Sequence, residues 1–214
     1  MKKIFFALSA AVVMASCGGD TAADAGTAVK KDTIVPQVCT YSYDSSATEI
    51  GFGAFKFTEK KEVKGSFLSF DVTGTKESDT LLNVFSAAKF TVSVASVSTG
   101  DISRDYKIKT NFFGTMDSTT LMTGWVKSVD TDSSRVIVAF KINNVEKDLV
   151  LNYTVSGDEL ELKGSLSLLD YKAQKSVDAL NKACKDLHKG TDGVSKTWSD
   201  VNIYIKTKLK NSCK

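Results

Sequence analysis

The sequence predicts an all-β domain, an antiparallel β-barrel, over residues 38–214. From residue 40 onward, apolar and polar residues alternate with a period of two, the pattern of strands with one buried and one wet face. Short polar turns such as 130–134 (DTDSS) and 156–158 (SGD) separate these segments, and loops this short favour antiparallel neighbours. A sheet of about nine such strands usually closes on itself or folds into two layers.

Five segments show the alternation most clearly. The apolar residues that share one face in each segment are Phe90, Val92 and Val94; Val136, Val138, Phe140 and Ile142; Leu149, Leu151, Tyr153 and Val155; Leu160, Leu162, Leu166 and Leu168; and Val201, Ile203 and Ile205. Shorter strands are expected at 40–45, 49–57, 65–73 and 121–129. The outward-facing positions hold Ser, Thr, Lys, Glu and Asp without an aromatic girdle, so this surface suits water rather than a bilayer.

Two segments depart from the strand pattern. Residues 104–113 (RDYKIKTNFF) are expected to form a short helix or an ordered loop. Residues 172–189 predict an amphipathic helix, because apolar or thiol side chains recur at spacings of three and four residues: Val177, Leu180, Cys184 and Leu187. Gly190 stands where such a helix would end with a glycine cap.

The N-terminus has the layout of a secretory signal peptide over residues 1–16. Lys2 and Lys3 precede an apolar run that is too short to span a membrane, and Ala15-Ser16 then leads to Cys17. This junction resembles a lipobox, although Met14 stands where leucine is usual. We therefore expect an exported lipoprotein on the periplasmic or outer-membrane and surface side, held at the membrane by acyl chains on Cys17 alone. Ordinary cleavage that leaves a free protein is the alternative. Residues 17–37 read as a flexible linker with a reach of roughly 25 Å.

Composition argues against several classes of function. Removal of Lys2 and Lys3 would leave 26 basic residues against 25 acidic ones, without the concentrated positive charge that nucleic-acid binding needs. The sequence has one histidine, His188, and no Ser-His-Asp order, HExxH motif or glycine-rich phosphate loop. We expect no enzymatic activity, no metal site and no cofactor.

Apart from the expected anchor Cys17, the sequence has three cysteines: Cys39, Cys184 and Cys213. An odd number in an exported protein allows one disulfide at most and leaves one thiol free. Cys39 opens the first expected strand and Cys213 closes the last, and these ends would be adjacent if the two strands were neighbours in a closed antiparallel barrel. Cys39 with Cys213 is therefore the preferred pair, and Cys184 with Cys213 is the alternative.

Several segments, in this order, resemble the YceI-like family: YSYDSSATEIGFGAFKF, GSFLSFDV, FTVSVASVSTGDISRDYKIKTNFFG, INNVEKDLVLNYTV and GDELELKGSLSLLDY. The most specific part is TGDISRDYKIKTNFFG at 99–114. The resemblance implies an exported, lipocalin-like barrel that holds a polyisoprenoid or another long-chain amphiphile in its lumen, without catalysis, here as a lipoprotein variant. Residues 172–199 depart from the family pattern, because a helix and loop replace a short link before the last strand.

The resemblance favours an apolar lipid ligand inside the barrel. The expected lining consists of Phe90, Val92, Val94, Val136, Val138, Phe140, Leu149, Leu151, Tyr153, Leu160, Leu162, Ile203 and Ile205. Arg104 is the candidate for a phosphate head group, since guanidinium binds phosphate in bidentate fashion. A salt bridge from Arg104 to Asp101 or Asp105 is the alternative. The alternative function is a structural or interaction lipoprotein with a filled core, in which the insertion at 172–199 docks a protein partner.

Overall fold

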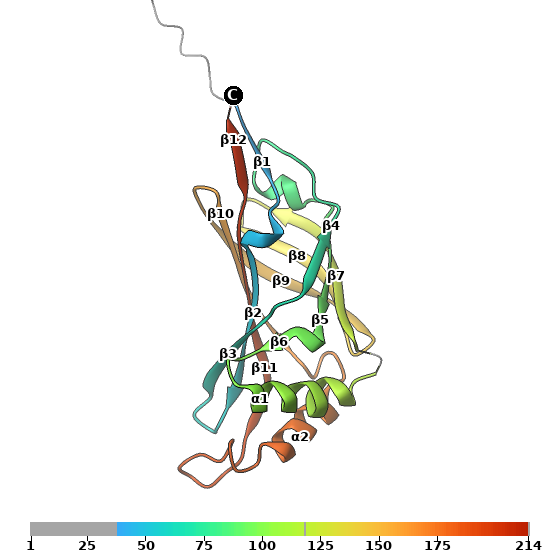
Figure 1. Cartoon of the computed structure of the whole chain (residues 1–214), viewed down its shortest axis with the longest axis vertical. Helices are drawn as coiled ribbons and strands as arrows, with labels where there is room; N and C mark the ends of the chain where they lie inside the picture. The colour runs from blue at the N-terminus through green and yellow to red at the C-terminus, as the bar shows by residue number, and fades with distance from the viewer. Residues whose placement is uncertain (1–37, 118, 214) are drawn as a thin grey trace, which may run out of the picture. The chain divides into compact units, whose positions relative to one another are not determined.

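The computed structural model describes residues 38–117 and 119–213, so the expected signal segment, linker and Cys17 anchor lie outside the described residues. The main element is a ten-stranded antiparallel sheet with the order β4-β5-β7-β8-β9-β10-β11-β2-β3-β6 (Figure 1). The strands are β2 (Thr48–Lys56), β3 (Lys61–Phe67), β4 (Phe70–Thr73), β5 (Lys89–Ser93), β6 (Val97–Ser98), β7 (Leu121–Asp130), β8 (Arg135–Ile142), β9 (Val145–Ser156), β10 (Glu159–Ser167) and β11 (Thr197–Lys208). The all-β fold class predicted from the sequence is confirmed.

The sheet curls because two stretches of the chain each supply a strand to both ends of the sheet: one stretch holds β3 and β4, and the other holds β5 and β6. β3 and β4 follow each other with a break at Leu68 and Ser69, and β5 and β6 are separated by a 3-10 turn at Val94–Ser96. Across the breaks, Leu68 N donates to Ser96 O (3.1 Å) and Ser93 N donates to Ser69 O (3.0 Å). These bonds hold the ends of the sheet together, which gives the curled arrangement of a lipocalin-like fold.

The first and last strands form a separate two-stranded ribbon. β1 (Cys39–Ser42) pairs antiparallel with β12 (Lys210–Cys213), and Cys39 lies directly opposite Cys213. A disulfide joins these two cysteines, whereas Cys184 is free and buried. The two strands are neighbours, as the preferred pairing assumed, but not within the barrel: β2 and β11 make that contact in the main sheet, and the ribbon extends beyond the sheet (Figure 1).

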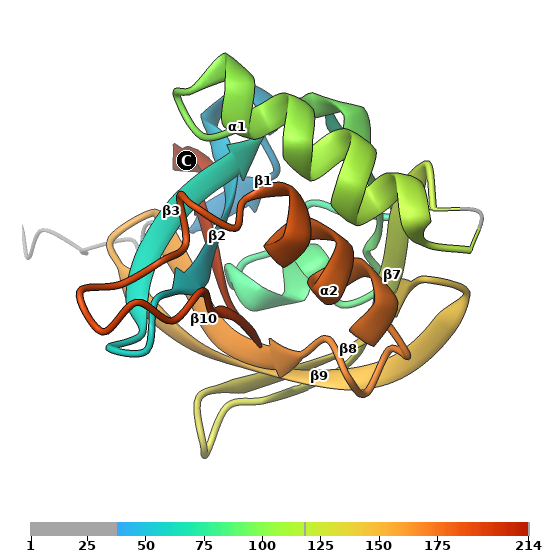
Figure 2. The ribbon, with the colours of Figure 1, turned by 90° about the horizontal axis from the view of Figure 1, so that it is seen from below.

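Two helices lie across the end of the curled sheet opposite the ribbon (Figures 1 and 2). α1 (Ile102–Lys107) continues into a π-helical turn at Ile108–Phe112 and a 3-10 turn at Phe113–Thr115. It begins at Asp101, whose side chain accepts a hydrogen bond from Arg104 N (3.0 Å) and so satisfies a free amide of the first turn. The segment expected as a short helix or loop is therefore helical.

The second helix, α2 (Gln174–Ala183), is shorter than the predicted 172–189. It starts later because Lys172 has a φ of 56°, a left-handed conformation that a right-handed helix does not contain. It ends earlier because the chain turns after Ala183 and then forms a bridge between Lys189 and Ser195. Gly190 lies in that hairpin, where its amide donates to Val194 O (3.0 Å), and it is not a helix cap.

In the part of the chain that the structure describes, neither helix has the length and apolar character needed to cross a membrane.

Candidate functional site

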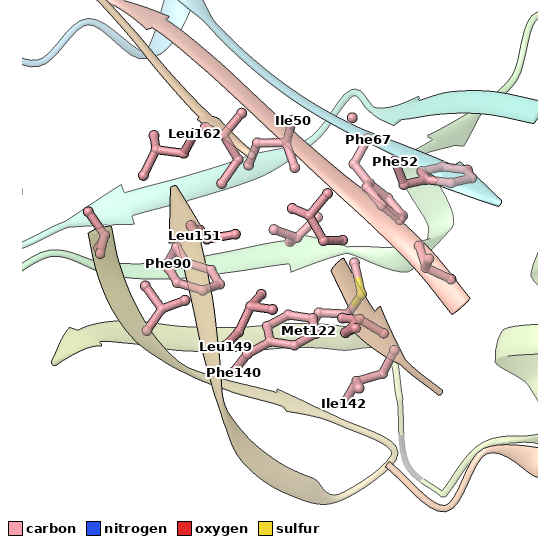
Figure 3. A pocket seen from close by; sticks show the side chains of 18 of the residues that line it. Ile50, Phe52, Phe67, Phe90, Met122, Phe140, Ile142, Leu149, Leu151 and Leu162 are labelled. Atoms are coloured by element: carbon pink, nitrogen blue, oxygen red, sulfur yellow. The ribbon is translucent and has the colours of Figure 1, made fainter. Parts of the chain in front are cut away.

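The curled sheet encloses a cavity of about 240 Å³, which we call the lumen (Figure 3). This is many times the roughly 10–15 Å³ that one water molecule needs. Eleven predicted residues line it: Phe90, Val92, Val136, Val138, Phe140, Leu149, Leu151, Leu160, Leu162, Ile203 and Ile205. The structure thus leaves an open, apolar space where the alternative interpretation expected a filled core.

Val94 and Tyr153, which were also expected in the lining, do not line the lumen. β5 ends at Ser93 and a 3-10 turn begins at Val94, so the strand alternation stops there and Val94 packs into the core instead. Tyr153 lies on the inward face of β9 but packs, half-buried, between the main core and a smaller apolar cluster beside it.

Several lining residues were missed. In β2, Ile50, Phe52 and Ala54 face the lumen at every second position, so their alternation could have identified them. In β7, the inward positions Val126 and Val129 are three residues apart. A register shift between Val126 and Ser128 inserts one residue and changes which face is inward, a bulge that simple alternation does not reveal.

The family-like motif at 99–114 supplies part of the lumen wall. Asp105 accepts hydrogen bonds from Thr99 N (2.8 Å) and Thr99 Oγ1 (2.6 Å), which fixes the start of α1 against the preceding strand. Phe112 and Phe113 follow α1, pack edge to face with ring centroids 4.9 Å apart, and both line the lumen. The motif therefore builds the helix that contributes two aromatic rings to the cavity.

Two inward-facing glycines make room for aromatic rings in the wall. Gly65 lies opposite Phe52 and Gly124 lies opposite Phe90 in the strand register. A Cβ at Gly65 would lie 2.5 Å from Phe52 Cζ, and one at Gly124 would overlap the Phe90 ring and a backbone carbonyl. The rings therefore lie over the glycines, against the strand backbone.

Toward the ribbon, the lumen borders a small apolar cluster whose fully buried members are Val84, Leu160 and Leu209. Tyr43 also lines this end, and its hydroxyl is buried without a hydrogen-bond partner among the described residues. Burial raises the pKa of Tyr43. Nearby, the hydroxyls of Thr48 and Thr207 bond to each other (2.7 Å). This end of the lumen holds hydroxyl groups and no charged side chain.

At the helix end, a second cavity of about 150 Å³ lies beside the lumen, and we call it the basic pocket. Its polar lining consists of Lys56 from β2, Thr99, the α1-segment residues Asp101, Ser103, Arg104 and Lys107, and His188 and Thr197. Arg104 therefore does not line the lumen. Its guanidinium lies 3.7 Å from Asp101 Oδ2, so one of the two salt bridges weighed from the sequence is present.

Cys184 is buried and His188 is half-buried, and both line the basic pocket. His188 Nδ1 is 2.6 Å from Thr197 Oγ1, and burial together with the positive charges of Lys56, Arg104 and Lys107 lowers its pKa to about 4. Burial raises the pKa of the Cys184 thiol. The described residues contain no group of three or more His, Cys, Asp or Glu side chains placed to hold a metal ion.

Comparison with known proteins identifies the fold and the family. A domain from Saccharophagus degradans, described as a polyisoprenoid binding domain implicated in plant cell wall breakdown, has a TM-score of 0.54 at 13% identity over 82% of this chain and 99% of that one. BcnA of Burkholderia cenocepacia has a TM-score of 0.52 at 13% identity, over 80% of this chain and 99% of that one. No curated protein sequence matches this chain. The family model for the YceI-like domain matches residues 41–209. The chain therefore belongs to the YceI-like family.

Proposed function

We propose that this protein is an exported lipoprotein that holds or carries a long-chain, isoprenoid-like lipid in its lumen. The observation that carries the proposal is the open apolar lumen, which runs from the cluster of Val84, Leu160 and Leu209 to the helices at the other end. The polyisoprenoid-binding domain with the same fold supports this ligand class. No catalytic step is part of the proposal.

The lumen suits a flexible hydrocarbon chain for a physical reason. Transfer of apolar surface from water contributes about 25 cal/mol per Å², and this gain needs no polar partner along the chain. The lining side chains seen in Figure 3 are aliphatic, aromatic or Met. Affinity would therefore depend on how much of the chain is covered, with loose selectivity for chain chemistry.

A blocking substitution tests the carrier function. Ile203 lines the lumen in the middle of β11, and Ile203→Trp would place an indole in the space of the ligand. We expect native mass spectrometry of the wild-type protein, purified without added lipid, to show an apolar adduct that Ile203→Trp lacks. The matched control is Val150→Trp, at a position that is 46% exposed. Equal lipid retention by wild type and Ile203→Trp, with a native circular dichroism spectrum, would reject the lumen as the binding site.

The proposed anchor is Cys17, on the basis of the signal-like segment and the lipobox-like junction before it. Acyl chains on this cysteine would keep the domain within reach of the bilayer through a linker of about 20 residues. We expect the wild-type protein to fractionate with membranes and to incorporate labelled palmitate. Cys17→Ala should abolish both without unfolding the domain. Retention of this variant in the membrane fraction would overturn the acyl anchor.

A further inference from the structure

The basic pocket points to the chemistry of the ligand's head group. We propose that the ligand is an anionic amphiphile whose oxyanion head group, a phosphate or a carboxylate, is held in this pocket by Lys56, Arg104 and Lys107. The inference rests on the proposed lipid-binding function and adds to it the class of head group and the direction in which the ligand lies.

The basic pocket and the lumen share part of their walls. Five residues line both cavities: Phe52, Ala54, Ile108, Leu180 and Thr197. The two cavities are therefore adjacent, and a movement of these shared side chains would let the end group of a chain in the lumen reach the basic pocket. The α1 and α2 segments, which contribute to both walls, cover one end of the curled sheet (Figure 2).

The charges around the basic pocket are unbalanced. Three cationic side chains line it against a single carboxylate, that of Asp101, which already lies 3.7 Å from the Arg104 guanidinium. Lys56 Nζ donates to the Leu187 carbonyl (3.2 Å) and lies 4.4 Å from the centre of the Phe57 ring. Within 38–117 and 119–213, neither Lys56 nor Lys107 has a carboxylate within 4.0 Å. A bound oxyanion would supply the missing negative charge.

The electrostatics of neighbouring groups agree with this geometry. Lys56, Arg104 and Lys107 together lower the pKa of His188, after burial as the main cause. Burial and the charge of Arg104 also lower the pKa of Lys56. The three cations therefore act on one small volume from two different elements, β2 and α1. Neutral His188 leaves the pocket with net positive charge supplied by these three side chains.

The opposite end of the lumen is lined by no cationic side chain among the described residues. Its lining consists of apolar side chains and the hydroxyls of Tyr43, Thr48 and Thr207, and it borders a cluster of buried aliphatic residues. An anionic head group placed there would lose its hydration without gaining a cationic partner. The head group therefore lies at the helix end, and the tail points toward the β1–β12 ribbon.

Three probes with the same tail test the head-group assignment: geranylgeraniol, geranylgeranoic acid and geranylgeranyl phosphate. Binding to the delipidated, full-length mature protein can be followed through Trp198, which lines the lumen, after Trp125, 41% exposed on β7, is replaced by Phe. Because a charge-assisted hydrogen bond contributes more than a neutral one, we expect the phosphate to bind at least about tenfold more tightly than the alcohol. This advantage should shrink as salt is raised.

Substitutions identify the residues that create the advantage. Lys56→Met and Lys107→Met keep much of the aliphatic stem but remove the charge, and each should weaken phosphate binding by about tenfold while changing alcohol binding less than about twofold. Arg104→Met should act in the same direction. The control is Lys185→Met, which removes an exposed lysine beside Cys184 that does not line the basic pocket. It should leave the binding of all three probes unchanged.

The outcomes separate this inference from the proposed function. If alcohol, acid and phosphate bind equally and the lysine substitutions have no selective effect, the head-group assignment is overturned while lipid binding stands. If inorganic phosphate alone binds as tightly as the prenyl phosphate, the basic pocket is a site for free anions and the assignment is likewise overturned. If no probe enters the lumen, the proposed function itself fails.

Discussion

An open lumen and a packed core respond differently when a large side chain is cut back. Leu209 is 2% exposed and belongs to the packed cluster near the ribbon, outside the lumen. Ile203 is half-buried and faces the lumen. Substitution by alanine removes three carbon groups from either residue, so the two changes are chemically alike. They differ in what surrounds the removed atoms.

The expected penalties follow from that difference. For Leu209→Ala, loss of three buried groups at about 0.8 kcal/mol each gives about 2.4 kcal/mol, and the new cavity raises this to about 3–4 kcal/mol. In the lipid-free protein, the Ile203 side chain faces the open lumen, so Ile203→Ala loses only the contacts with neighbouring strands. We expect the free energy of unfolding to fall by about 1 kcal/mol or less, beyond the effect of the lower strand propensity of alanine. Val150→Ala, on the outer face of β9, measures that propensity effect.

Urea denaturation of delipidated protein, followed by far-UV circular dichroism, measures these free energies of unfolding. When the lumen is loaded with lipid, the Ile203→Ala penalty should increase, because the ligand packs on the side chain, whereas the Leu209→Ala penalty should not change. If Ile203→Ala costs as much as Leu209→Ala in the lipid-free protein, the lumen is packed in solution and the reasoning fails.

Three further predictions concern stability. The Cys39→Ser/Cys213→Ser variant should lose about 2–5 kcal/mol in urea denaturation, because the bridge spans 174 residues and restricts the unfolded chain; an unchanged midpoint would contradict this. The pKa of His188, about 4, lies below that of the unfolded chain, so the contribution of His188 to stability should be fully present above its unfolded pKa and fall by about 1–2 kcal/mol as the pH drops toward 4. His188→Asn should flatten that fall, as thermal melts at several pH values can check. Gly124→Ala should destabilise the protein by about 1–3 kcal/mol, since its Cβ would overlap the backbone carbonyl of Ala139; a melting temperature within error of wild type would count against this.

Strict alternation identified most of the lumen from the sequence. It succeeded in β8, β10 and β11, where inward residues such as Val138, Leu162 and Ile205 occur at every second position. It failed where the backbone departs from regular pairing. The bulge in β7 moves Val129 to the inner face, and the 3-10 turn after β5 removes Val94 from it. Such irregularities depend on neighbouring strands, which a single segment does not reveal.

The basic pocket was only partly predictable. Arg104 was identified by its side-chain chemistry, but Lys56 and Lys107 carry no local signal, because their proximity arises from β2 and α1 meeting in space. The cysteine pairing was expected from the order of the strands. The ribbon that holds it was not, since nothing in 39–42 distinguishes a strand of the main sheet from a strand outside it.

The helical segment after Thr99 connects the two proposed halves of the ligand site. Arg104 and Lys107 lie in the basic pocket, and Phe112 and Phe113, further along the same continuous helical segment, line the lumen. The hydrogen bonds between Asp105 and Thr99 fix this segment to the strand before it. A ligand with its tail on the aromatic rings and its head group on the cations would therefore contact one rigid element at both positions. If the proposed ligand binds in this way, the spacing between the cations and the rings along that segment would set which combination of head group and chain can bind at once, and it would give a lumen that otherwise tolerates any hydrocarbon a means of selecting its ligand.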